Sequence, residues 1–113
     1  MANILQQTLT ANGSTEAITW KPLRKNTPNR ATVIFYGNFG GGTIELQFSP
    51  DDGTTWIAIV DQAGNPIQAN SNTIVNFELY GNGNPIAGQT NRIRATLTAS
   101  TAPNLNVQIN DAR

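Results

Sequence analysis

Residues 44–60 read IELQFSPDDGTTWIAIV, and this stretch decides the fold class. Apolar and polar residues alternate from Ile44 to Phe48, which is the period-two pattern of a strand with one buried face. Pro50 then fixes φ before a corner, and Asp52-Gly53 favours a hairpin because glycine reaches positive φ without a steric penalty. A second apolar run, Trp56–Val60, follows the turn. The stretch therefore predicts a strand, a tight turn and a returning strand.

The returning strand is too apolar to have only one buried face. We expect it to run from Thr55 to Asp61, to be buried on both faces or to pass under a loop, and to place Trp56 in the core beneath the turn. Asp51 is expected to hold the turn by bonding the backbone two residues ahead. A Ca²⁺ loop over residues 51–54 is the alternative, but this segment lacks the spaced oxygen ligands and the closing glutamate of an EF-hand.

The turn also matches a known local motif. The pattern S-x-D-x-G-x-T-W is fitted by Ser49, Asp51, Gly53, Thr55 and Trp56. The segment resembles the Asp-box of bacterial neuraminidases and other β-rich proteins. This resemblance implies a structural hairpin, in which the aspartate ties down the turn and the tryptophan packs beneath it, far from any reaction. A sialidase propeller needs several four-stranded blades, so 113 residues with a single copy of the motif exclude it.

Strand-like runs recur along the whole chain, separated by turns rich in Gly, Asn, Pro and Ser. We predict about eight strands, at Asn3–Thr10, Glu16–Trp20, Arg30–Gly37, Thr43–Phe48, Thr55–Asp61, Thr73–Tyr80, Asn91–Thr98 and Leu105–Asn110. This spacing indicates one all-β domain over residues 1–113, a single antiparallel β-sandwich. The number of strands favours a jelly-roll, with an immunoglobulin-like sandwich as the alternative. Residues 1–10 are expected to form an N-terminal arm or an edge strand.

Composition excludes several classes of protein. The chain contains no Cys and no His, which removes disulfides, thiol nucleophiles and imidazole bases. Seven Lys and Arg balance seven Asp and Glu, and a neutral chain lacks the positive charge that nucleic-acid binding uses. The first residues, MANILQQTLTANG, have no basic segment followed by an apolar one, and no apolar run reaches the length of a membrane span. We expect a soluble protein that is made in the cytoplasm and binds neither nucleic acid nor membrane.

Few residues could carry out catalysis. Without His and Cys, acid–base chemistry would need two facing carboxylates, and the adjacent aspartates at 51–52 diverge in a tight turn. Glu45 and Glu78 could meet, but cross-strand pairing with Arg92 or Arg94 is the favoured interpretation of both glutamates. We therefore expect no enzyme activity, no cofactor and no metal site.

Three further groups of residues have both a functional and a structural interpretation. Gly40-Gly41-Gly42 lacks the lysine of a phosphate loop and is expected to be a flexible hairpin loop. The basic residues between the second and third strands are interpreted as a solvated loop, and they are Lys21, Arg24, Lys25 and Arg30. Aromatic rings near strand ends could stack on sugars in a carbohydrate-binding module, and the candidates are Trp20, Tyr36, Phe39 and Tyr80.

A longer segment carries a second resemblance. Residues 32–60 read TVIFYGNFGGGTIELQFSPDDGTTWIAIV, so a glycine-rich segment, an alternating strand and the SPDDGTTW hairpin follow one another. A second segment nearer the end of the chain contributes to the same resemblance, and its residues are Asn91, Arg92, Arg94, Thr96 and Thr98. The chain resembles small β-sandwich structural proteins of tailed bacteriophages. This resemblance implies a virion component, most simply a capsid decoration (cement) protein that bridges capsid subunits, or a head or tail accessory protein.

The resemblance also implies partners and a location. The partners would be the major capsid protein or other virion proteins, the chain would form a homo-oligomer, for which we assume a trimer, and it would reside in the virion. Partner contacts are expected at the N-terminal arm and in the loop over residues 81–88, with the candidates Asn3, Ile4, Leu5, Tyr80, Asn82 and Asn84. The alternative function is a carbohydrate- or receptor-binding β-module of a tail or surface protein.

Overall fold

The computed structural model of the chain describes residues 2–20, 29–61, 63–79 and 91–111. These residues contain strands and turns and no helix. In chain order the strands are β1 (Ala2–Leu9), β2 (Gly13–Ser14), β3 (Ile18–Thr19), β4 (Asn29–Asn38), β5 (Thr43–Ser49), β6 (Ile57–Ala58), β7 (Gln68–Ala69), β8 (Thr73–Leu79), β9 (Arg92–Thr98) and β10 (Asn104–Asp111).

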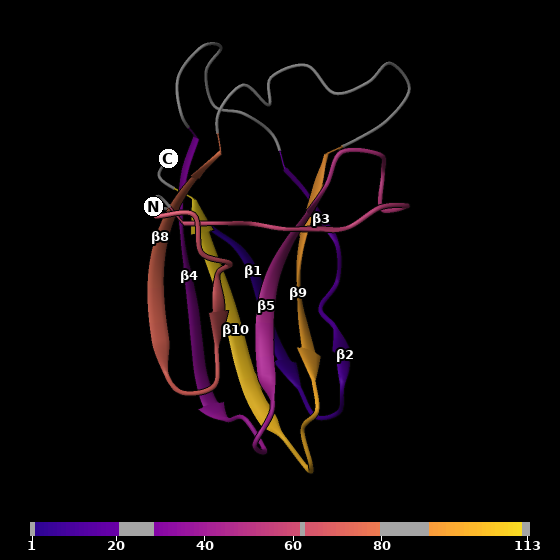
Figure 1. Ribbon diagram of the computed structural model, residues 1–113, viewed down its shortest axis with the longest axis vertical. Coiled ribbons are helices and arrows are strands. Elements are labelled where there is room, and N and C mark those ends of the chain that lie inside the picture. Colours follow the sequence, from indigo (N-terminus) through magenta and orange to yellow (C-terminus); the bar gives the residue numbers. More distant parts are fainter. Residues whose placement is uncertain (1, 21–28, 62, 80–90, 112–113) are drawn as a thin grey trace.

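The strands form two antiparallel sheets that pack face to face (Figure 1). One sheet, here called sheet A, has the order β1-β10-β4-β8. The other, sheet B, has β9 and β5 at its centre, with β2 and β3 both paired to β9 on one side and β6 and β7 both paired to β5 on the other. The predicted fold class, a single antiparallel β-sandwich, is confirmed.

The order of the strands is that of a jelly-roll. When β2 with β3 and β6 with β7 are each taken as one interrupted strand, the described residues form eight strands. The first then pairs with the last, the second with the seventh, the third with the sixth and the fourth with the fifth. This arrangement is a long hairpin wrapped into two four-stranded layers, as in jelly-roll domains. The topology favours the jelly-roll over the immunoglobulin-like alternative.

The core lies between the two sheets and follows the alternation of the sequence. On β10, Leu105, Val107 and Ile109 are fully buried, while the intervening residues point to the outside. Central strands of both layers supply the other fully buried large side chains, which are Val33, Phe35, Ile44, Leu46, Ile93 and Leu97. Burial of such a layer is the main favourable term in folding a chain of this size.

Four connections cross from one sheet to the other at the lower end of the molecule in Figure 1. They comprise residues 10–12, 39–42, 70–72 and 99–103, and we call this end the tip. The predicted flexible hairpin loop at Gly40–Gly42 is wrong, because β4 and β5 belong to different sheets and do not pair. The segment is also packed: a Cβ at Gly40 would lie 2.4 Å from the carbonyl oxygen of Thr101.

The segment after the Asp-box turn also differs from its prediction. In place of a buried strand over Thr55–Asp61, only Ile57–Ala58 forms a strand, and the side chains of Ile57 and Val60 are 54% and 50% exposed. The reason is topological, because this segment forms the outer edge of sheet B. The edge is shared with β7, a two-residue strand that the sequence pattern does not indicate. On the other edge, the predicted strand over residues 16–20 is reduced to β3.

Candidate interaction surfaces

The Asp-box hairpin is held by two side chains. The Ser49 hydroxyl, which is fully buried, accepts hydrogen bonds from the backbone N–H groups of Gly53 at 2.8 Å and Asp51 at 3.3 Å, and donates one to Asp51 Oδ1 at 2.8 Å. Asp51 Oδ1 accepts from the backbone N–H of Thr55 at 2.7 Å. The bond to the residue two positions ahead is therefore made by Ser49, and Asp51 reaches four residues ahead. The hydrogen bonds with Thr55, followed by the one from Ser49, hold the pKa of the Asp51 carboxyl below its ordinary value of 3.8.

Trp56 lies outside the core, contrary to prediction. It is half-buried, and the Arg94 guanidinium lies 4.1 Å from its ring centroid. Because Arg94 alternates with the buried Ile93 and Ala95, this stacking places the indole on the outer face of sheet B. The indole does pack beneath the turn, since a Cβ at Gly53 would lie 3.6 Å from its ring. Burial lowers the pKa of Arg94, whose guanidinium stays charged at any ordinary pH.

The charged residues of the sheets pair differently from expectation. Glu45 lies on the outer face of sheet B and accepts hydrogen bonds from the side-chain amides of Gln47 at 3.0 Å and Gln68 at 3.1 Å. The predicted pairing of Glu45 and Glu78 with Arg92 or Arg94 is wrong. Arg92 instead pairs with Asp52 at 2.8 Å, Arg94 donates to Gln47, and Glu78 pairs with Arg30 at 2.9 Å on sheet A. Glu45 and Glu78 belong to different sheets and do not meet.

Several predicted site residues lie outside the described residues. They are Lys21, Arg24, Lys25, Tyr80, Asn82 and Asn84. Of the predicted contacts at the N-terminus, Leu5 is buried in the core with 6% exposure, so its assignment as a partner contact is corrected. Ile4 is half-buried against the core, and Asn3 is exposed and donates to Asn110 Oδ1 at 3.1 Å. These residues belong to β1, which pairs with β10 along its length.

The aromatic rings do not form a stacking surface in the described part of the chain. Trp20 and Phe39 are buried, with 4% and 6% exposure, and Trp20 packs against Phe77 with 5.9 Å between ring centroids. Tyr36 is 39% exposed on the outer face of sheet A. Sugar-binding platforms use exposed rings, so the described aromatic residues do not supply one.

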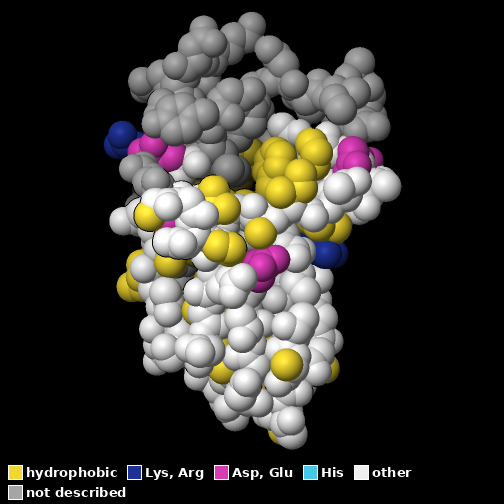
Figure 2. Space-filling model, viewed as in Figure 1, with side chains coloured by type: hydrophobic (Ala, Val, Ile, Leu, Met, Phe, Trp, Pro, Cys, Tyr) yellow, Lys and Arg dark blue, Asp and Glu magenta, His cyan; other side chains and the backbone are white. Residues whose placement is uncertain are grey.

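The tip has no charged residue. Its four connections consist of Asn, Gly, Ser, Thr, Ala, Pro and one Phe, and no charged side chain is seen near the lower end in Figure 2. Asn12 ties two of the connections together: its Oδ1 accepts from the Ser100 backbone N–H at 2.9 Å and the Ser100 hydroxyl at 2.7 Å, and its Nδ2 donates to the Ser100 carbonyl. The tip is thus an ordered surface whose polarity comes from amides and hydroxyls.

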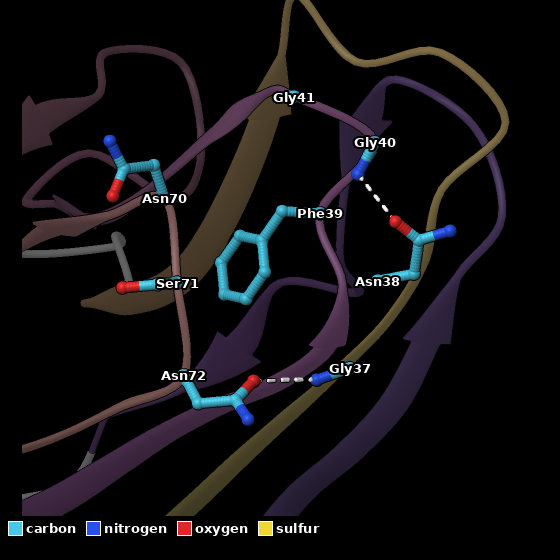
Figure 3. Close-up of a pocket in the computed structure, with 8 residues that line it drawn as sticks. All are labelled: Gly37, Asn38, Phe39, Gly40, Gly41, Asn70, Ser71 and Asn72. Atoms are coloured by element: carbon cyan, nitrogen blue, oxygen red, sulfur yellow. Dashed lines mark hydrogen bonds between the residues drawn. The ribbon is translucent and has the colours of Figure 1, made fainter.

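A shallow hollow of about 410 Å³ lies at the tip between the connections 39–42 and 70–72 (Figure 3). Two of its amides support the backbone: Asn38 Oδ1 accepts from the Gly40 N–H at 2.9 Å, and Asn72 Oδ1 accepts from the Gly37 N–H at 3.0 Å. The Phe39 ring points across the hollow toward Ser71. The exposed Asn70 lies next to Ser71 on the same connection (Figure 3). The hollow therefore offers amide and hydroxyl groups around a buried ring.

The outer face of sheet A combines a polar region with a small apolar one. Hydrogen bonds join side chains across neighbouring strands, from Thr8 to Asn106 at 2.7 Å and from Thr32 to Asn76 at 2.7 Å. Near β8, Ile34 lies directly opposite Ile74, whose side chain is 68% exposed. The exposed isoleucine was missed by sequence analysis, although the alternation of β8 around the buried Phe77 places Ile74 on the solvent side.

Known proteins supply no match for this chain, whether it is compared with family models, curated proteins or solved structures. In the described ranges no cluster of three or more acidic side chains has the arrangement of a metal site. The same residues include no helix of the length and apolar character needed to cross a membrane.

Proposed function

We propose that the protein is a structural component of a bacteriophage particle, most simply a decoration protein that binds across the seam between capsid subunits. The observation that carries this proposal is the uncharged tip. Protein interfaces are depleted of charged residues at their centres, and in antibody paratopes Asn, Ser and Gly supply hydrogen bonds that adapt to a partner. An entire end of the sandwich has this composition, whereas the described charged side chains lie on the strands, between β2 and β3, and at the other end.

The protein would act by reinforcing the contacts between capsid subunits and would carry out no reaction. Each protomer would place its tip on neighbouring capsid subunits, and the other end would face solvent or a further protomer. An uncharged contact has little dependence on salt, because screening acts on pairs of charges. Repetition over many equivalent seams strengthens attachment without strong single contacts, since a capsid presents many copies of one site. The fold is compatible with this role, as jelly-rolls occur in viral capsid domains and also in lectins.

Binding to empty heads tests the proposal. Heads assembled from the major capsid protein of the same phage are mixed with the purified protein, and bound protein is measured by sedimentation. The tip variant carries Asn38→Asp, Asn70→Asp and Asn72→Asp. Aspartate keeps the acceptor oxygens that bind the Gly40 and Gly37 N–H groups, so the variant is expected to fold. Three buried carboxylates would weaken the contact at least about tenfold.

A matched variant tests whether the position of the added charges, and not the change in net charge, causes the loss of binding. It adds the same three charges away from the tip, as Gln6→Glu, Asn65→Asp and Asn110→Asp. Asn110 also acts through its Oδ1 atom, so its hydrogen bonds survive the change, and the side chains of Gln6 and Asn65 are exposed. This variant is expected to bind as the wild type does. Failure of the wild-type protein to bind heads would overturn the proposed function, and equal binding by the tip variant would overturn the tip as the contact.

A carbohydrate- or receptor-binding module is the second candidate. The hollow in Figure 3 favours it, because amides and a hydroxyl surround a concave surface at loops of a sandwich. Binding to a glycan array, lost in the tip variant and kept in the matched variant, would support this candidate. Binding to heads with no glycan bound would favour the decoration protein.

A further inference from the structure

The four edges of the two sheets are not alike. On sheet A, β1 has an irregular register between Asn3 and Leu5, so Ile4 is bulged out of the pairing. Both edges of sheet B are interrupted, by residues 15–17 between β2 and β3 and by residues 59–67 between β6 and β7. The remaining edge is β8, whose seven residues from Thr73 to Leu79 all pair in unbroken register with β4. No described strand pairs with its other side.

A regular edge strand is a template for pairing with another chain. Proteins prevent this by bulges, interruptions, prolines or lysines on the edge. Three edges of this sandwich have a bulge or an interruption, and β8 has none of these features. Its single charged residue is Glu78, which pairs with Arg30 on the neighbouring strand. The contrast indicates that β8 is kept open for a partner strand.

The outer face beside this edge includes a small apolar region around Ile74. Ile74 is 68% exposed at the centre of the N-terminal half of β8, and its neighbour across the strands is Ile34. Tyr36 follows on β4 and is 39% exposed. Elsewhere the same face is made of hydrogen-bonded amides and hydroxyls, which include Asn76 on β8 itself. Pairing at β8 would therefore shield part of the exposed Ile74 side chain.

We propose that two copies of the chain associate through β8, as an antiparallel pair of strands related by a two-fold axis. A second copy is the fitting occupant because it offers the same regular strand, and a symmetric pairing closes after two subunits. The charges permit it: in an antiparallel pair the two Glu78 residues lie at opposite ends of the contact, so like charges do not meet. The two sheets A would join into one eight-stranded layer, with Ile74 of each copy beside the junction. The proposal is independent of the proposed function.

The size of the contact sets its expected strength. Seven residues at a rise of roughly 3.4 Å give a contact about 24 Å long. One strand pair with its flanking side chains falls below the area of about 1,200–2,000 Å² that stable complexes bury. The dimer should therefore dissociate on dilution, and its molar mass should fall from two chains to one over protein concentrations from about 1 mM to about 1 μM.

Sedimentation equilibrium over that range tests the proposal with two matched variants. Pairing of all seven residues about a two-fold axis places Asn76 of one copy opposite Asn76 of the other. Asn76→Asp therefore sets two like charges against each other, and it keeps the oxygen that accepts from Thr32, so the fold should be retained. Asn106→Asp makes the same change on the central strand β10 and keeps the oxygen that accepts from Thr8. We expect Asn76→Asp to raise the dissociation constant by about tenfold or more and Asn106→Asp to leave it unchanged. Ile74→Thr, which removes apolar surface without adding charge, should give a smaller increase.

Three outcomes would overturn the proposal: a wild-type protein that is monomeric throughout the range, a closed trimer, or a dimer that Asn106→Asp disrupts and Asn76→Asp does not. Amide hydrogen exchange gives a second readout. Exchange of β8 should slow as the wild-type protein is concentrated and should slow less in Asn76→Asp. Slowing confined to β1 would place the contact on the other edge of sheet A and would also overturn it.

Discussion

Ser49 shows how one side chain can determine a turn. Its hydroxyl is fully buried at the end of β5 and serves two backbone N–H groups and the Asp51 carboxylate. The resemblance to the Asp-box implies that the aspartate and the tryptophan hold the turn. In this chain the buried serine shares that role with the aspartate, and the tryptophan packs outside the core.

Replacing Ser49 with alanine is expected to destabilise the protein by about 1–3 kcal/mol, because the Gly53 N–H loses its acceptor at a buried position. The free energy of unfolding from urea titration measures the effect. Ser71→Ala is the matched control, since Ser71 is exposed and its hydroxyl takes part in no hydrogen bond in the described structure. A loss for Ser49→Ala as small as that of the control would contradict the assigned role.

Asp51 should make stability depend on pH in the acid range. Hydrogen bonds lower the pKa of its carboxyl below 3.8 in the folded state, so ionised Asp51 stabilises the fold above the unfolded pKa. This contribution is lost as the pH falls through the lowered folded-state pKa. Thermal melting of wild type and Asp51→Asn between neutral pH and the low-acid range checks it. The difference in melting temperature should be constant near neutrality and shrink on acidification; a difference that grows would contradict the sign.

At the scale of elements, the connections of the tip are as closely fitted as the strands. Gly40 and Gly41 both have positive φ, at 60° and 76°. A Cβ on Gly40 would meet the Thr101 carbonyl oxygen at 2.4 Å, whereas a Cβ on Gly41 would meet nothing within 4 Å. Substituting Gly41 therefore measures the free-energy cost of the backbone conformation alone, and substituting Gly40 adds the cost of a steric clash.

Gly41→Ala is expected to cost about 1–2 kcal/mol, which is the penalty of the left-handed conformation alone. Gly40→Ala should cost about 2–5 kcal/mol, because the clash with the 99–103 connection adds to that penalty. Chemical denaturation of both variants gives the comparison. Equal losses would mean that the two connections are not packed against each other.

Sequence patterns predicted the long strands well and the short ones poorly. The strict alternation from Ile93 to Leu97 and from Leu105 to Ile109 leaves one interpretation, and both strands are found there. The run after Trp56 is apolar, yet it lies at the edge of sheet B, where Ile57 and Val60 are exposed and Ile59 is buried. The connection at Gly40–Gly42 was recognisable from its glycines. The meeting of four connections at one uncharged end depends on the wrapping of the whole chain, which no local pattern contains.

At the scale of the whole molecule, the jelly-roll order makes most contacts distant in sequence. β1 pairs with β10, and β10 is also the neighbour of β4 in the centre of sheet A. Sheet A therefore cannot form without the last strand. Topologies dominated by such pairings fold slowly, because loop closure must precede the contacts that stabilise them.

Refolding is accordingly expected on a time scale of about milliseconds to seconds. Stopped-flow fluorescence follows it through Trp20, which is buried in the core. Refolding in microseconds would contradict the dominance of distant pairings. A Trp56→Phe variant, which removes the half-exposed indole, should refold with the same main phase and a cleaner signal.

The pairing of Ala2 with Asp111 has a practical consequence. It brings both extremities of the described chain to the side of the sandwich away from the tip (Figure 1). A peptide or fluorescent protein fused to either extremity would leave the molecule in the same direction and leave the tip unobstructed. The same closeness allows the extremities to be linked and the polypeptide to be reopened elsewhere, so circular permutants with new openings at the tip would show directly whether that surface is needed for attachment.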